Sequence, residues 1–128
     1  MEFVHPSQIG AVWPMAEPLL LSILAKTGEE WTPAHVRAAC EAGGAAMFVA
    51  EGSLVVAVAR ECEFTGRREL FVWCAAGDFP KHVGWFMQHA RENGFSRLGF
   101  DSPRKGWRRR FKEGQTYYYA EVMNEQVA

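Results

Sequence analysis

Three apolar runs in the middle of the chain constrain the fold more than any other feature. Residues 45–50 read AAMFVA, residues 54–61 read LVVAVARE and residues 69–76 read ELFVWCAA. Their length and their β-branched and aromatic side chains are typical of strands, and the Glu-Gly-Ser between the first two indicates a hairpin. Because the runs are almost continuously apolar, they predict strands that are covered on both faces.

Helical patterns lie on both sides of these strands. We expect a first helix over residues 17–26, because Pro14 and Pro18 interrupt regular helical hydrogen bonding before that point. A second begins after Thr32, an N-cap residue followed by a proline at the first helical position. A third, with Asp78 as its N-cap, carries its apolar residues at helical spacing on one face.

Shorter elements complete the pattern. Strands are expected over residues 2–5, 95–101 and 115–123, and a short amphipathic helix over residues 103–113. The expected order is therefore β-α-α-β-β-β-α-β-α-β, an α/β fold with a mixed sheet and helices on both faces. At 128 residues the chain is expected to form a single domain, 1–128.

Positive charge is concentrated in one segment. The net charge is -1, yet six of the nine residues from Arg104 to Lys112 are basic. On a helix Arg104, Arg108 and Lys112 would share one face, which predicts a partner-binding surface for a protein. Nucleic acid is a second possible partner of residues 104–112, and the solvated face of an ordinary amphipathic helix is the third interpretation.

The cysteines and the apolar stretches exclude other classes. Cys40, Cys62 and Cys74 form no C-x-x-C pair, so we expect neither a zinc site nor a disulfide framework, but buried thiols in a reducing compartment. The N-terminus lacks the features of a signal peptide. Residues 18–25, the most apolar stretch, are too few to span a bilayer. We therefore expect a soluble protein with no membrane partner.

The order of elements and two segments resemble the GNAT superfamily of N-acyltransferases. ARENGFSRLGFD, residues 90–101, resembles the family's helix that closes before the fifth strand. GWRRRFKEGQTYYYAEV, residues 106–122, resembles its following motif, an aromatic-bearing helix before a β-hairpin. The combination of Arg104, Gly106-Trp107 and Lys112-x-Gly is similar to that of short GNAT-like proteins of tailed bacteriophages.

The resemblance implies an acyl-CoA site after the third apolar run. Members hold the pyrophosphate on consecutive backbone N–H groups that open a helix, where the helix dipole favours anions. The matching residues would be Trp73, Cys74, Gly77, Asp78 and Lys81. This loop has no G-x-G, Pro80 lacks an N–H, and Asp78 adds a negative charge, so we expect a degenerate cradle.

Catalytic residues are also implied by the resemblance. Glu69 is the expected base for a substrate amine, with Glu61 and Glu63 as alternatives at nearby strand ends. The family's general-acid tyrosine is matched by Arg110 and Phe111, so Tyr118, or one of its two tyrosine neighbours, is the expected substitute. No metal site is expected.

Two functions follow from these expectations. The first is a phage-derived, virion-associated or accessory interaction protein in the host cytoplasm or the virion, with a protein partner and no cofactor. The alternative is an N-acyltransferase that uses acetyl-CoA to acylate an amine by direct attack on the thioester. Because function lies in the site rather than in the scaffold, the fold alone does not decide between them.

Overall fold

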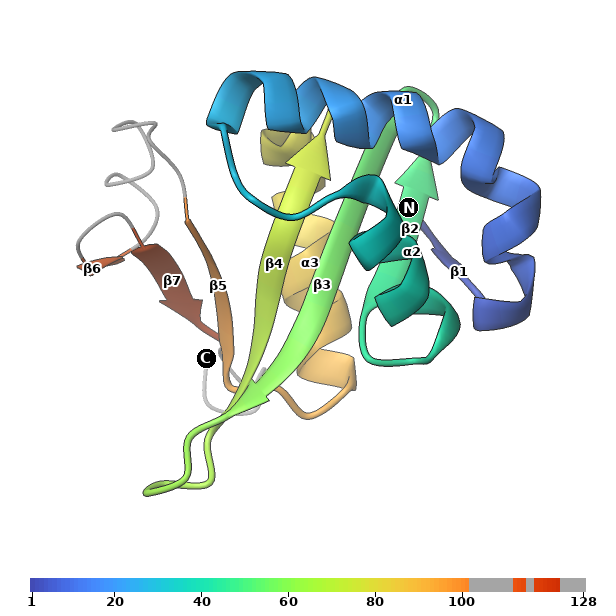
Figure 1. Cartoon of the computed structure of the whole chain (residues 1–128). Coiled ribbons are helices and arrows are strands. Elements are labelled where there is room, and N and C mark those ends of the chain that lie inside the picture. The colour runs from blue at the N-terminus through green and yellow to red at the C-terminus, as the bar shows by residue number, and fades with distance from the viewer. Residues whose placement is uncertain (102–111, 115–116, 123–128) are drawn as a thin grey trace.

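The computed structural model describes residues 1–101, 112–114 and 117–122, with 112–114 and 117–119 described by their backbone alone. In this part of the chain a seven-stranded mixed sheet has the order β1-β2-β3-β4-β5-β7-β6. Helices α1 and α2 cover one face of the sheet and α3 covers the other (Figure 1). The α/β class, the mixed sheet and helices on both faces are thus confirmed.

The strands follow the expected apolar runs closely. Neighbouring strands are antiparallel except β4 and β5, which are parallel and joined through α3. The strands are β1 (Glu2–Val4), β2 (Ala46–Ala50), β3 (Ser53–Glu61), β4 (Arg68–Ala76), β5 (Arg97–Asp101), β6 (Lys112–Gly114) and β7 (Tyr117–Glu121). The predicted hairpin is confirmed, since β2 and β3 pair directly around the turn at Glu51.

Two helices begin where their cap residues predicted. The Thr32 side chain accepts a hydrogen bond from the backbone N–H of His35 at the start of α2 (Pro33–Glu41). Helix α3 (Phe79–Glu92) follows Asp78, although the Asp78 side chain makes no capping hydrogen bond. Thr32 therefore stabilises its helix directly, whereas the first turn of α3 is left without a side-chain cap.

Helix α1 is longer than its prolines predicted. After a 3-10 turn at Pro6–Gln8 it runs over Ile9–Thr27, straight through Pro14 and Pro18. A proline deprives the carbonyl four residues earlier of its donor. Here those carbonyls belong to Gly10 and Pro14, both exposed residues, so water can supply the missing bonds.

The long helix passes a simple test for a membrane span. Pro6–Thr27 is apolar and long enough to cross a bilayer, with a mean hydropathy of 1.3. Core helices of soluble proteins pass the same test, and α1 places Ile9, Ala16, Leu20 and Ile23 in the core. The prediction that the apolar stretch is too short to span a bilayer assumed a helix that begins at residue 17, whereas α1 begins at Ile9, so that assumption was wrong.

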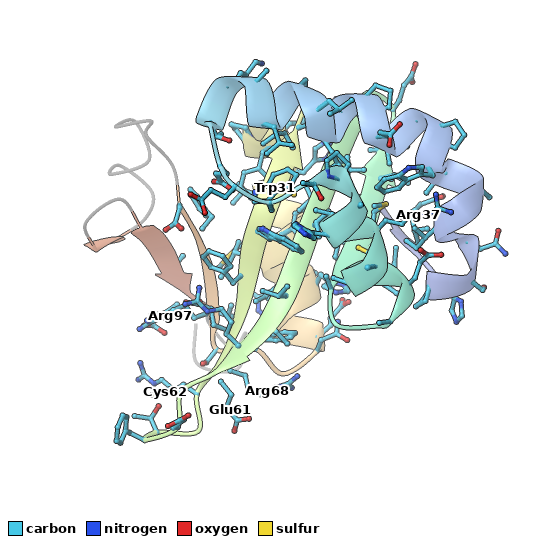
Figure 2. The ribbon with its side chains drawn as sticks, in the orientation of Figure 1. Trp31, Arg37, Glu61, Cys62, Arg68 and Arg97 are labelled. Atoms are coloured by element: carbon cyan, nitrogen blue, oxygen red, sulfur yellow. The ribbon has the colours of Figure 1, made fainter. Side chains whose placement is uncertain are left out.

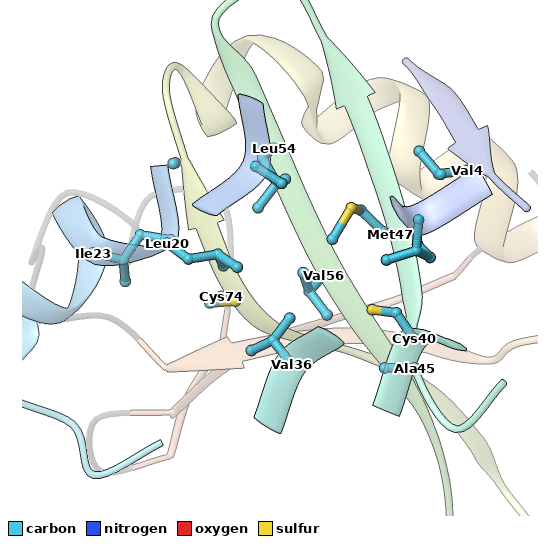
Figure 3. Close-up of a cluster of buried hydrophobic side chains, with 13 residues drawn as sticks. Val4, Leu20, Ile23, Val36, Cys40, Ala45, Met47, Leu54, Val56 and Cys74 are labelled. Atoms are coloured by element: carbon cyan, nitrogen blue, oxygen red, sulfur yellow. The ribbon is translucent and has the colours of Figure 1, made fainter. Parts of the chain in front are cut away.

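Two clusters of buried side chains hold the layers together, one on each face of the sheet. Beneath α1 and α2, Leu20, Val36 and Met47 are fully buried among strand residues (Figure 3). Beneath α3, the Phe48 and Phe86 rings meet edge to face with centroids 5.2 Å apart. Full burial of such side chains stabilises the fold by about 1.5–3 kcal/mol each.

The helix expected over residues 103–113 is wrong at its C-terminal end. Lys112–Gly114 form strand β6, which pairs antiparallel with β7. A β-hairpin satisfies the backbone of residues 112–114 through β7, and this pairing overrides the helical spacing of the sequence. Because Lys112 is in a strand, the prediction that it shares a helical face with Arg104 and Arg108 is wrong for Lys112. Arg104 and Arg108 themselves lie outside the described residues.

Candidate functional site

The parallel strands β4 and β5 open towards their C-terminal ends. Their ladder joins Glu69 to Arg97 at one end and Val72 to Phe100 at the other, while β4 continues to Ala76. In open α/β sheets, ligands bind in the crevice outside the carboxyl ends of parallel strands. This end of the sheet is therefore the expected position of a ligand site.

An irregularity in β4 lies at the point where the strands separate. Opposite β3, Val56 pairs with Cys74 and Ala57 pairs with Val72, so Trp73 is an extra residue in the strand. Such a bulge redirects side chains and bends the strand. Trp73 packs against Trp31 of the loop between α1 and α2, with ring centroids 6.0 Å apart, and the two rings join this loop to the sheet.

A cavity of about 260 Å³ lies at this opening, and we call it the apolar cavity. Helix α1 contributes its last turn, α3 its first turn, and both parallel strands contribute their ends (Figure 1). Its lining residues are Ile23, Lys26, Thr27, Glu29, Val72, Trp73, Cys74, Ala75, Gly77, Phe79, Pro80, Phe100 and Asp101. The volume suits a small ligand or one arm of a larger one.

Three of the five residues expected to bind a cofactor line this cavity. Trp73, Cys74 and Gly77 are brought together there, whereas Asp78 and Lys81 are exposed residues outside its lining. Gly77 has φ +86°, and a Cβ on it would lie 2.5 Å from the Gly52 carbonyl oxygen. This close approach requires glycine and presses the β4–α3 loop against the β2–β3 turn.

Anion binding at the start of α3 is weakened by its own residues. Pro80 lies in the first turn, where it removes one of the N–H groups that point out of a helix N-terminus. Asp78 adds a carboxylate beside the remaining groups, and Glu29 and Asp101 bring two more carboxylates to the cavity. Lys26 is the cation among the cavity's lining residues. This arrangement is unfavourable for a pyrophosphate.

The contacts and burial of Glu29 and Cys74 define the state of these two side chains in the apolar cavity. Glu29 accepts a hydrogen bond from the Trp31 indole N–H, which holds the carboxylate at the cavity. Burial raises the pKa of the Cys74 thiol above its ordinary value, with a smaller contribution from Cys40. The Cys74 thiol is therefore protonated at neutral pH and behaves as a small apolar group.

A second cavity of about 390 Å³ lies at the other end of the same strands, and we call it the charged cavity. It is bounded by the β3–β4 hairpin and by β5, where Glu61, Cys62, Arg68 and Arg97 gather (Figure 2). Its lining residues are Arg60, Glu61, Cys62, Arg67, Arg68, Glu69, Arg97 and Asp101. Asp101 thus lines both cavities.

Ion pairs connect the strands around this cavity. Glu121 of β7 receives a hydrogen bond from Arg97 at 2.9 Å and an ion pair from Arg67 at 3.6 Å. Glu69 lies 3.6 Å from the Arg60 guanidinium, which in turn lies 4.2 Å above the Phe71 ring. The pairs hold side chains from four strands in one charged cluster.

Glu69, the expected catalytic base, is at the centre of this cluster. Burial raises the pKa of the Glu69 carboxyl above its usual range, while Arg60 and then Arg97 oppose that shift. A carboxylate with a raised pKa is a better proton acceptor than an exposed one. The position suits the expected role, which stays a prediction.

Cys62 differs from the other two cysteines. It is exposed in the hairpin loop, so the expectation of three buried thiols was wrong here, while Cys40 and Cys74 are buried as predicted. Hydrogen bonds from the Thr65 side chain and from the Thr65 and Phe64 backbones lower the pKa of the Cys62 thiol. The residue lies where β3 ends and the loop begins, a boundary that the apolar pattern did not resolve.

Other expected site residues remain untested. Tyr118 lies in β7 opposite Phe100 of β5, and its side chain is outside the described part of the chain. Arg104 and Arg108 are not among the described residues. Among the residues that the structure describes, there is no group of three or more His, Cys, Asp or Glu side chains that could hold a metal ion.

Several cavity residues were not found from the sequence. Asp101 had a usable signal, because it ends the strand that follows the crossover helix. Arg60, Arg67 and Arg97 had none, since only the strand register brings them together. The chain matches no protein-family model and no curated protein, so the site rests on geometry alone.

Proposed function

We propose that this chain is a GNAT-like N-acyltransferase domain in which the apolar cavity takes the thioester end of an acyl donor and the charged cavity takes an amine. The observation that carries the proposal is that two unlike cavities lie along β4 and β5 and meet at Asp101. A transfer between two substrates needs such adjoining sites, because reacting atoms have to approach within about 3–3.5 Å.

The apolar cavity fits the arm of a donor better than its nucleotide. A pantetheine arm is extended and carries amide groups, so it can lie along the end of β4 beyond the last residue paired with β5, much as an added strand would. The pyrophosphate of CoA meets Pro80 and the Asp78 carboxylate instead of a glycine-rich cradle. Donor recognition is therefore assigned to the arm and the acyl group.

In the charged cavity, Glu69 would accept a proton from the amine. The nitrogen forms a bond to the thioester carbonyl carbon, the carbon–sulfur bond breaks, and the thiolate leaves. Tyr118 stays the predicted donor of a proton to that thiolate. The raised pKa of Glu69 favours proton uptake at this position.

The experiment compares acetyl-CoA with S-acetyl-pantetheine as ligands in thermal unfolding. A ligand present at about 100 times its Kd stabilises the folded state by about 2.7 kcal/mol, which is several degrees for a domain of this size. We expect similar dissociation constants for both ligands. Failure of both to raise Tm would contradict the proposal.

A matched pair of variants locates the binding. Thr27 lines the apolar cavity, so Thr27→Trp should block it and abolish the shift. Ser22 lies on the same helix but outside the cavity. The two hydroxyls make the same kind of hydrogen bond, since Ser22 donates to the Leu19 carbonyl and Thr27 donates to the Ile23 carbonyl. Ser22→Trp is therefore the control, and it should keep the shift.

A phage-derived, virion-associated or accessory interaction protein is the second candidate. The features that favour it are the negative charge of Asp78 and the proline at the start of α3, which weaken any nucleotide site. In that case residues 104–112 would bind a protein partner or nucleic acid, and neither thioester would change Tm. The same experiment thus separates the two candidates.

A further inference from the structure

The charged cavity has both signs of charge at close range. Its lining carries four arginines against three acidic residues, and Glu121 lies just beside them. A cavity for a plain amine needs only the acidic groups, which bind an ammonium ion. The arginines therefore require their own explanation.

Two of these arginines have side chains that are more than half exposed. The Arg60 side chain is 54% exposed and the Arg67 side chain is 60% exposed. A guanidinium has five N–H donors, and one carboxylate partner engages two of them at most. Arg60 and Arg67 thus retain donors for an incoming anion.

The arginines are also held in place before any ligand arrives. Arg60 lies above the Phe71 ring and 3.6 Å from Glu69, and Arg67 lies 3.6 Å from Glu121, so both side chains are oriented by contacts within the protein. Prearranged side chains lose less conformational entropy when they bind a ligand. This favours a specific anion site over a loosely charged surface.

The acidic end of the cavity is more enclosed. The Glu69 side chain is only 14% exposed, and Asp101 lies at the junction with the apolar cavity. An amine bound between Glu69 and Asp101 would face the acyl group, with Arg60 beside Glu69 and Arg67 towards the hairpin. Glu69 and Asp101 thus make the junction with the apolar cavity acidic, while the hairpin end carries Arg67 and Arg68 against Glu61.

We propose that the charged cavity selects an amine that carries its own anionic group, a carboxylate or a phosphate, a few bonds from the nitrogen. This assignment of the acceptor class rests on the proposed acyl transfer. Arg60 and Arg67 bind the anionic group, and Glu69 with Asp101 binds the ammonium. Alkylamines of the same length lack the first set of contacts.

The test measures equilibrium binding without any thioester, so it does not depend on transfer. The probes are ω-amino acids from glycine to 6-aminohexanoate, alkylamines of matching length, and phosphoethanolamine, each titrated by ligand-observed NMR. We expect one amino acid of the series, or phosphoethanolamine, to bind about tenfold tighter than its matched alkylamine, the scale of one charge-assisted hydrogen bond. Tighter binding of an amino acid would identify the preferred anionic group as a carboxylate, and tighter binding of phosphoethanolamine would identify it as a phosphate.

Variants connect that preference to the cavity. Arg67→Gln should remove most of the preference, and Arg67→Lys should restore only part of it, because lysine keeps the charge without the planar fork. Arg91→Gln, on α3 beside Gln88, removes one positive charge elsewhere and should change nothing. Unfolding curves of the variants confirm that they are folded.

The outcomes separate this proposal from the proposed function. Equal binding of amino acids and alkylamines, or a preference that survives Arg67→Gln, would overturn the acceptor class even if acyl transfer occurs. A clear preference in a protein that binds neither acetyl-CoA nor S-acetyl-pantetheine would support the anionic amine site and sink the transferase.

Discussion

The two cavities share Asp101 and the same pair of strands, yet they are built from different kinds of residue. Phe79, Phe100 and Val72 of the apolar cavity belong to the hydrophobic core. The charged cavity is lined mainly by exposed side chains at the end of a hairpin. The apolar cavity is therefore coupled to folding, whereas the charged cavity can change its chemistry at little cost in stability.

This difference follows from which ends of β4 and β5 are covered by helices. Helices α1 and α3 meet the sheet at the C-terminal ends of β4 and β5, so a cavity there is enclosed by packed elements (Figure 1). At the other end the hairpin extends past the helices, and its described side chains are held by surface ion pairs, cation–π contacts and single hydrogen bonds. Exposed ion pairs contribute about 0–1 kcal/mol each.

The largest expected effect tests the coupling of the apolar cavity to the core. Phe79 is 8% exposed, and its ring lies 5.6 Å from Phe100 and 5.9 Å from Phe86. Phe79→Ala should reduce the free energy of unfolding by about 3–5 kcal/mol, measured by denaturant titration. Phe64→Ala is the control, since Phe64 is 96% exposed in the hairpin loop and should cost within about 0.5 kcal/mol. Equal losses would remove the contrast between the two regions.

The second-largest expected effect is a difference in alkylation rate between one cysteine of each cavity. Cys62 of the charged cavity is exposed with a lowered pKa, whereas burial raises the pKa of Cys74 and raises that of Cys40 to about 11. Alkylation by iodoacetamide at pH 8, followed by mass spectrometry, should modify Cys62 at least about a hundredfold faster than the other two.

The hydrogen bonds from Thr65 provide the check on this second prediction. Thr65→Val removes the side-chain bond to the Cys62 thiol and should slow its alkylation at pH 8 by raising its pKa. Comparable rates at Cys62 and Cys74 would mean that the apolar cavity opens to solvent as readily as the hairpin does.

Local signals in the sequence predicted the enclosed part of the molecule well. The N-cap Thr32 and the apolar runs of β2, β3 and β4 predicted their elements, because cap bonds and strand patterns act between near neighbours. Pro14 and Pro18 were misleading, because they lie on the exposed side of α1, where solvent replaces the lost backbone bonds.

The charged cavity was hardly predictable, and the reason is physical. Arg60, Arg67, Arg97 and Glu121 are brought together by strand pairing, and nothing in their local spacing shows that register. Glu69 was predicted by resemblance, without the arginines that surround it. Trp73 was predicted to bind a cofactor. The bulge that turns it towards the loop before α2, however, depends on the pairing register of β3 with β4, which local spacing does not show.

The smallest expected effect concerns Glu69 and the pH dependence of stability. Because the folded state raises the pKa of Glu69, it holds the proton more tightly than the unfolded chain does. The stability that this group contributes is complete below its ordinary pKa of 4.5 and is lost as the pH rises through the folded value. Relative to Glu69→Gln, the parent should therefore lose stability with rising pH above 4.5 and then level off. The change should be about 1 kcal/mol or less.

Arg60 offers an opposing change at the same carboxyl. Its positive charge lowers the pKa of Glu69, so Arg60→Gln should extend the loss of stability to higher pH. Unfolding free energies of the parent and both variants, measured from pH 4 to pH 8, are the required data. Parallel curves for the parent and Glu69→Gln would show that Glu69 is solvated like a surface residue. The charged cavity would then lack the enclosed acidic end that an amine acceptor needs, and its difference from the apolar cavity would be greater still.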